Sequence, residues 1–147
     1  MKLSAKSCDA SRVTDDDVVA VLTAVAARLL PSDPSDAVCV DGAREARIDR
    51  YLKRALLDPF LVDVGPFLRA AASHLHGARF LDVDDAARDA MLRSLASGAP
   101  IAGVDGSVFV RVMTLLTIEG FLADPKYGGN HDRVGWRALA FDPRGRT

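Results

Sequence analysis

The sequence predicts an all-α protein: a single-domain helical bundle of about five helices, followed by an ordered C-terminal loop rich in glycine and aromatic residues. Three observations support this fold class. Apolar residues recur at the three- and four-residue spacing of a helix face, residues that start or stop helices flank these stretches, and no alternating run bounded by turns indicates a sheet. With 147 residues, 49% of them hydrophobic and 27% charged, the chain is also large enough to form one core.

The first two helices are predicted over residues 15–30 and from about residue 42 onward. Thr14 and Asp17 match a capping box at the start of the first helix, and Pro31 ends it. The stretch 32–36 that follows consists of residues that favour turns. The second helix pairs a strongly charged face, most simply solvated, with one apolar stripe; the stripe comprises Ile48, Tyr51, Leu52, Ala55 and Leu56.

Three further helices are predicted over residues 66–77, 82–98 and 107–120. Pro66 suits the first turn of the third helix, and Gly77 suits its end. Asp82 and Ser107 are the expected N-caps of the fourth and fifth helices. Because the fifth helix is apolar on nearly all sides, we expect it to lie at the centre of the bundle.

The segment 120–136 departs from helical periodicity and combines turn formers with the single tryptophan of the chain. Pro125 restricts the backbone, whereas Gly128–Gly129 permits a positive φ or a close approach of the main chain. Tyr127 and Trp136 supply large amphipathic surfaces of the kind found at interface hot spots. We expect a rigid loop and consider two roles for it: a surface that binds another protein, or a plug for the open end of the bundle.

The three histidines are the residues best suited to acid–base chemistry near neutral pH. His74 and His76 lie two residues apart on a predicted helix, so they project to different faces and cannot share a metal ion as an i,i+4 pair does. His131 lies in the C-terminal loop with no nucleophile motif around it. The sequence contains no metal-ligand cluster and no phosphate-binding glycine motif. We therefore expect the chain to have no catalytic residue, metal site or cofactor of its own.

Charge and hydropathy limit the partners. The net charge of −1 argues against a nucleic-acid partner, and the longest apolar stretch, Val18 to Leu30, is shorter than the ~20 residues that a membrane span needs. The N-terminal residues contain no twin-arginine motif and no hydrophobic stretch of an export signal. As the sequence stands we expect a cytoplasmic location; a periplasmic or membrane-associated one is the alternative if a signal was removed or lies on a partner. Cys8 and Cys39 are expected to be reduced thiols.

The segment 117–130 reads TIEGFLADPKYGGN and continues through Asp132 to Gly135-Trp136. It resembles the carboxy-terminal signature of the gluconate 2-dehydrogenase subunit 3 family. Leu29-Leu30-Pro31, and Gly42-Ala43 leading into residues 48–52, resemble the family more loosely. The predicted organisation is a flexible N-terminal segment, a helical small-subunit domain and a C-terminal tail, over residues 1–12, 13–143 and 144–147.

The resemblance implies a small, non-catalytic subunit that binds and stabilises a large FAD-dependent dehydrogenase of the glucose–methanol–choline type, acting on sugars, sugar acids or related alcohols. FAD would belong to that partner, and some complexes of the family add a cytochrome subunit. In the family the small subunit is often exported with a twin-arginine signal; this sequence departs from the pattern there. The candidate partner interface comprises Phe121, Asp124, Pro125, Tyr127, Gly128, Gly129, Asn130, Gly135 and Trp136.

One alternative belongs to a different function class. A free-standing small enzyme could use His131 with Asp132 or Glu119 as acid–base groups. Co-purification with a yellow flavoprotein would favour the accessory subunit over this enzyme.

Overall fold

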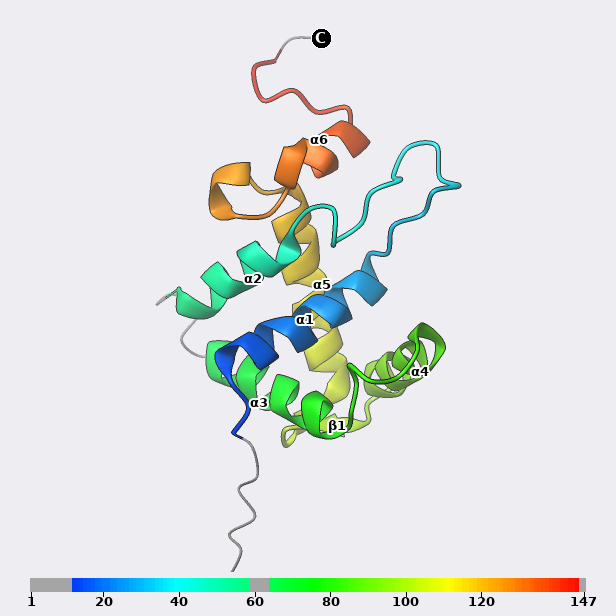
Figure 1. The fold of residues 1–147 in the computed structure, drawn as a ribbon, viewed down its shortest axis with the longest axis vertical. Helices are drawn as coiled ribbons and strands as arrows, with labels where there is room; N and C mark the ends of the chain where they lie inside the picture. Colours follow the sequence, from blue (N-terminus) through cyan, green and yellow to red (C-terminus); the bar gives the residue numbers. More distant parts are fainter. Residues whose placement is uncertain (1–11, 59–63, 146–147) are drawn as a thin grey trace, which may run out of the picture.

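The computed structural model describes residues 12–58 and 64–145, which form a helical bundle (Figure 1). Its α-helices are α1 (Asp15–Leu29), α2 (Ile48–Leu57), α3 (Val64–Gly77), α4 (Asp85–Ala96), α5 (Gly106–Leu122) and α6 (Val134–Ala138). A hairpin of β1 (Pro100–Ile101) and β2 (Val104–Asp105) precedes α5, and 3-10 turns at Pro125–Tyr127 and His131–Arg133 precede α6. The predicted helical, single-domain class is confirmed.

Some sequence predictions fall on residues beyond the described ranges. The predicted flexible segment 1–12 lies outside them except for Arg12, as do Cys8 and the last two residues of the tail. Cys39 is described: it is a half-buried free thiol whose Sγ lies 3.6 Å from the main-chain oxygen of Asp41.

Two helices cross at the middle of the bundle: α1, which contacts α2, α3, α4 and α5, and α5, which lies behind α1 in Figure 1 and contacts α1, α2, α4 and α6. The fifth helix thus shares the central position predicted for it, but it is not covered on all sides. Helix α5 buries one face and leaves Leu115 62% and Ile118 48% exposed. Periodicity identifies apolar side chains, but it does not tell which side of a helix a neighbour covers. The buried residues of α1 are Val18, Val21, Leu22, Ala24, Val25, Ala26 and Ala27.

The predicted capping box at the start of α1 is confirmed. The amide of Asp17 donates a 3.2 Å hydrogen bond to the hydroxyl oxygen of Thr14, and the Asp17 carboxylate accepts bonds of 2.8 and 2.7 Å from the Thr14 amide and hydroxyl. These bonds favour the charged carboxylate and lower the pKa of Asp17. The side chains of Thr14 and Asp17 thus accept hydrogen bonds from two main-chain amides at the start of α1.

The second helix begins later than predicted. Helix α2 starts at Ile48, whereas residues 43–47 form turns and Arg47 adopts the left-handed region with φ 54°. Gly42 allows this connection, because a Cβ there would lie 2.5 Å from the carbonyl carbon of Pro31. The turn thus lies against the end of α1, and the predicted apolar stripe begins with α2 itself.

The N-caps of α4 and α5 also differ from the prediction. Asp84 rather than Asp82 caps α4, and its side chain accepts a 2.8 Å hydrogen bond from the Ala87 amide. Asp105 rather than Ser107 caps α5, accepting a 2.8 Å bond from the Ser107 amide. Asp and Ser are both good N-cap residues, so composition alone does not choose between neighbouring candidates.

Two short elements are absent from the sequence prediction. The hairpin pairs Ile101 with Val104, and its strands are too short to show an alternating pattern. Helix α6 begins inside the segment predicted as loop, and a five-residue helix is too short for periodicity to reveal. The prediction that 120–136 contains no helix is therefore wrong at both ends, because α5 runs to Leu122 and α6 begins at Val134.

Candidate functional site in the C-terminal segment

The segment after α5 folds back over one end of the bundle. It lies around the C-terminal end of α5 and beside α2, at the end where α6 is labelled in Figure 1. Ala46, Phe121 and Val134 form a small buried cluster there, separate from the main core. The segment therefore has a core of its own, which fixes its position on the bundle.

Asn130 holds the two sides of this segment together. It is fully buried, and its φ of 46° lies in the left-handed region that asparagine tolerates better than most residues. Its Nδ2 donates a 2.9 Å hydrogen bond to the Ala123 oxygen, and its Oδ1 accepts a 2.9 Å bond from the Gly135 amide. The Asn130 side chain thus joins the main chain at Ala123 to the main chain at Gly135.

Two glycines bring the loop into direct contact with α5. A Cβ at Gly129 would overlap the main-chain oxygen of Gly120, and a Cβ at Gly135 would overlap the main-chain oxygen of Phe121. Only a residue without a side chain allows the main chains to approach this closely. These glycines therefore serve the close packing of the segment on α5.

Tyr127 lies at the surface on the side of α2. Its ring is 41% exposed, with the Arg54 guanidinium 4.8 Å and the Lys126 ammonium 5.0 Å from the ring centroid. Arg54 also donates a 3.0 Å hydrogen bond to the main-chain oxygen of Lys126. The sequence interpretation took the charged face of α2 as solvated and missed Arg54, because its partner lies 72 residues away in the chain.

Trp136 caps the C-terminal end of α5. Its indole Nε1 donates a 2.7 Å hydrogen bond to the Leu122 oxygen. Its half-buried ring packs edge-on against Phe141, with centroids 5.5 Å apart and an interplanar angle of 74°. Phe141 is 54% exposed and was also missed, since it follows the periodic and turn-rich stretches.

The nine predicted interface residues fall into two groups. The interior ones, Phe121, Gly129, Asn130 and Gly135, build the loop and close the end of the bundle. Asp124 and Tyr127 are exposed, whereas Pro125, Gly128 and Trp136 are half-buried. The plug role thus describes the interior group, and only the second group can meet another molecule directly.

His131 and Asp132, named in the enzyme alternative, lie on the outside of the segment. The His131 Nε2 is 3.5 Å from the Asp132 Oδ2, and the two side chains are 46% and 73% exposed. A hollow of about 260 Å³ is lined by Asp132 and residues further along the chain, but His131 is not among them. The pair is open to water rather than enclosed beside a substrate site.

Glu119, the other proposed acid–base group, is engaged with α2. It accepts a hydrogen bond from the phenol of Tyr51, and burial together with this bond raises the pKa of Tyr51. The carboxylate therefore helps to hold α2 on α5. This contact gives it a structural role.

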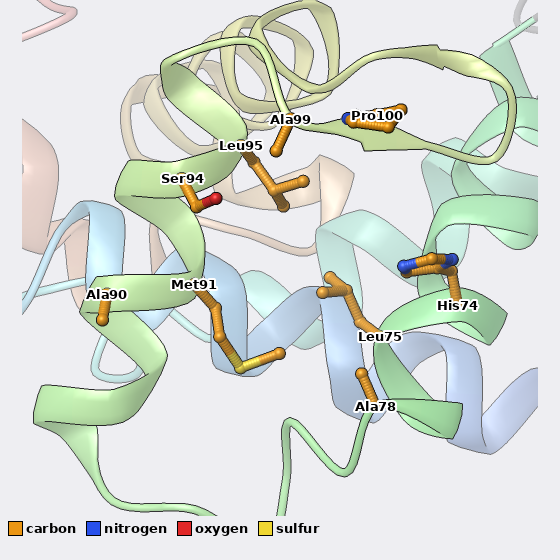
Figure 2. Close-up of a pocket in the computed structure, with 9 residues that line it drawn as sticks. All are labelled: His74, Leu75, Ala78, Ala90, Met91, Ser94, Leu95, Ala99 and Pro100. Carbon is orange, nitrogen blue, oxygen red and sulfur yellow. The ribbon is translucent and has the colours of Figure 1, made fainter.

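A hollow of about 440 Å³ lies between α3 and α4 (Figure 2). Leu75 and Leu95 point into it. Its lining is mostly apolar, with His74 and Ser94 as its polar side chains and no carboxylate or cysteine. Such a lining suits an apolar group rather than proton transfer or metal binding.

Within 12–58 and 64–145, no three His, Cys, Asp or Glu side chains are arranged to hold a metal ion. In the same ranges, no helix is long and apolar enough to cross a bilayer.

The comparisons with known proteins bear on the chain as a whole. A family model described as gluconate 2-dehydrogenase subunit 3 matches residues 16–143, which include the C-terminal segment and nearly all of the helical bundle. No curated protein and no solved structure matches the chain significantly. The family description implies association with other subunits of a dehydrogenase. The match covers most of the chain, so this protein belongs to the gluconate 2-dehydrogenase subunit 3 family.

Proposed function

We propose that this chain is a non-catalytic small subunit that binds and stabilises a large FAD-dependent dehydrogenase of the glucose–methanol–choline type. The family match over residues 16–143 is the observation that carries the proposal. FAD belongs to the large subunit, and the reaction is the oxidation of a sugar, a sugar acid or a related alcohol. A cytochrome subunit completes the electron-transfer path in complexes that contain one.

The architecture of the C-terminal segment supports a binding role. Its interior residues hold the loop rigidly on α5, so the exposed side chains lose little conformational entropy on association. Tyr127 is an exposed aromatic ring, held in place by Arg54, and Phe141 is a second one beside Trp136. Large aromatic side chains in fixed positions are the usual anchors of protein interfaces.

The exposed His131–Asp132 pair gives no support to the alternative of a free-standing enzyme. A general base works best where water is excluded and a substrate is held within hydrogen-bond reach. The accessory role does not need such a site, because the chemistry takes place on the flavin of the large subunit.

Co-expression tests the proposal. The large dehydrogenase subunit from the same organism is expressed with and without the full chain, and the soluble yield, the flavin absorbance per polypeptide and the activity are measured. We expect all three to rise in the presence of the chain, and a tagged chain to retain the yellow subunit. Equal yield, flavin content and activity with and without the chain would refute the accessory role.

Two variants locate the contact. Tyr127→Ala removes an exposed ring, and we expect it to weaken retention of the large subunit by about tenfold or more. Val104→Ala is the matched control, since Val104 is 37% exposed against 41% for Tyr127 but lies in β2, before α5. Equal loss in both variants would argue against the loop as the contact.

A further inference from the structure

The outward side of α2 carries a row of three cations. Arg50, Lys53 and Arg54 are exposed and occupy positions i, i+3 and i+4, which lie on one face of a helix. The opposite side of α2 is apolar and packs into the bundle. Because Arg50 and Arg54 carry the same charge four residues apart, they repel each other. The row therefore does not stabilise α2 by itself.

The neighbouring carboxylates do not neutralise this row. Within residues 12–58 and 64–145, no ion pair joins any of its three cations to a carboxylate. Asp49 is held by Arg47 through hydrogen bonds of 3.0 and 2.8 Å. Asp58, the C-cap residue of α2, interacts electrostatically with Tyr51. The row is therefore a local excess of positive charge on a chain whose net charge is −1.

The C-terminal loop borders the row and adds an aromatic ring to it. A Cβ at Gly128 would lie 3.1 Å from the main-chain carbonyl carbon of Arg50, so the loop lies directly against α2. The Arg54 guanidinium and the Lys126 ammonium lie 4.8 and 5.0 Å from the centroid of the Tyr127 ring. We call the combined surface the α2 basic face; it comprises Arg50, Lys53, Arg54, Lys126 and Tyr127.

We propose that the α2 basic face binds an acidic face of the large dehydrogenase subunit. This contact rests on the proposed function and adds to it the chemistry by which the partner is recognised. Asp and Glu carboxylates form ion pairs with Lys and charge-assisted hydrogen bonds with the forked guanidinium of Arg. Complementary charges of this kind steer two proteins together and set their orientation. Tyr127 then anchors the edge of the contact, since its ring is already held in place by Arg54.

An anionic membrane is a second class of partner that a basic surface can meet. Membrane-binding clusters contain roughly four to eight Lys or Arg residues, and on an amphipathic helix they stand beside an apolar face that enters the bilayer. The apolar side of α2 is unsuited to this, because Leu52 is fully buried in the bundle. Lys126, the fourth cation of the surface, lies 3.7 Å from the Asp124 carboxylate. These observations favour a protein partner.

Charge reversal tests the contact on the complex itself. The full chain is tagged and co-expressed with the large subunit, and the flavin absorbance retained per chain is measured over a dilution series. At an ionic strength of about 0.1 M, we expect Arg50→Glu/Lys53→Glu to weaken retention by about tenfold or more. Glutamate has a helix propensity close to that of arginine and lysine, so α2 should remain folded. Circular dichroism verifies this.

Ionic strength separates a charge effect from a structural one. Raising it from about 0.1 to about 1 M shortens the distance over which exposed charges act from ~10 to ~3 Å. We therefore expect the difference between the unaltered chain and Arg50→Glu/Lys53→Glu to shrink at the higher ionic strength. A difference that stays constant would come from altered packing and would overturn the proposal.

The matched control is Arg93→Glu/Arg111→Glu, which makes the same change in net charge at exposed positions of α4 and α5. It should retain the large subunit like the unaltered chain. Equal weakening in both double variants would overturn the proposal, and so would full retention by Arg50→Glu/Lys53→Glu. In either case the proposed function would stand, because the unaltered chain still retains the flavoprotein. An unaltered chain that retains no flavoprotein would refute both.

Vesicles of phosphatidylcholine and phosphatidylserine test the membrane. We expect the unaltered chain to stay in solution when these vesicles are sedimented. Sedimentation of the unaltered chain but not of Arg50→Glu/Lys53→Glu, with equal retention of the flavoprotein by both, would assign the α2 basic face to anionic lipid and overturn the proposal.

Discussion

The indole nitrogen of Trp136 donates a 2.7 Å hydrogen bond to the main-chain oxygen of Leu122. Leu122 is the last residue of α5, and the final carbonyl groups of a helix have no partner within it. The tryptophan side chain therefore links α6 to the end of α5, 14 residues earlier in the chain.

Trp136→Phe tests this link. Phenylalanine keeps most of the aromatic packing on Phe141 but cannot donate the hydrogen bond, so we expect the free energy of unfolding to fall by about 1–2 kcal/mol. Urea denaturation measures the change. Unfolding is followed by circular dichroism rather than by tryptophan fluorescence, because the variant lacks the chain's single tryptophan. An unchanged midpoint would show that water satisfies the Leu122 oxygen equally well.

Asn130 should be among the residues most sensitive to substitution. Asn130→Gly keeps the left-handed backbone accessible but removes both hydrogen bonds, so it should cost about 1–3 kcal/mol for the groups left unsatisfied. Asn130→Ala loses the same bonds and adds roughly 1 kcal/mol for the strained φ of 46°. Thermal and urea unfolding of both variants separate the two contributions. If alanine were tolerated as well as glycine, the backbone contribution would be refuted.

Two helical glycines should respond in opposite directions to alanine. A Cβ at Gly77 meets no atom within 4 Å, so Gly77→Ala should stabilise α3 by about 0.5–1 kcal/mol. A Cβ at Gly120 would lie 2.6 Å from Cδ1 of Tyr51 and overlap Ile48, so Gly120→Ala should destabilise by about 1–3 kcal/mol. Chemical denaturation of both variants measures the sign. A stabilised Gly120→Ala would mean that α2 can move away from α5.

The capping box predicts a pH dependence. The Thr14 amide and hydroxyl hold the pKa of Asp17 below its ordinary value of 3.8. A carboxyl with a lowered folded-state pKa adds stability that is present above the unfolded value and lost as the pH falls through the folded one. The unaltered chain should therefore be more stable than Asp17→Asn near neutral pH. The gap should close as the pH falls below 3.8 and through the lowered value, and melting curves from neutral to acidic pH follow it. A gap that stays constant would show that the charge of Asp17 is not its source.

The helices follow from local sequence features. The apolar spacing of α1 and the Thr14–Asp17 capping box involve residues within one or two turns of each other, so the linear sequence contains what is needed to recognise them. The predicted start of α2 is too early because residues 42–47 have helix-compatible composition. Only the contact of Gly42 with the end of α1 shows that they turn instead.

The candidate site could be recognised in part. The composition of 120–136 indicates a rigid, turn-rich segment, and the family resemblance there is confirmed by the match over residues 16–143. The sequence does not show which of its residues face outward. Asn130 and Tyr127 lie in the same turn-rich loop, yet the first is fully buried and the second is 41% exposed.

By itself the sequence determined the fold class, most of the helices and the family, because helix periodicity, caps and signature residues are encoded over short stretches. The tertiary structure alone decided which side of α5 is covered, that Leu115 faces outward and that Arg28 holds Asp89 with hydrogen bonds of 2.7 and 2.9 Å. The physical reason is that burial and pairing depend on residues distant in the chain. Arg28 and Asp89 are 61 positions apart, and no local pattern records which distant side chain will cover or pair with a given residue.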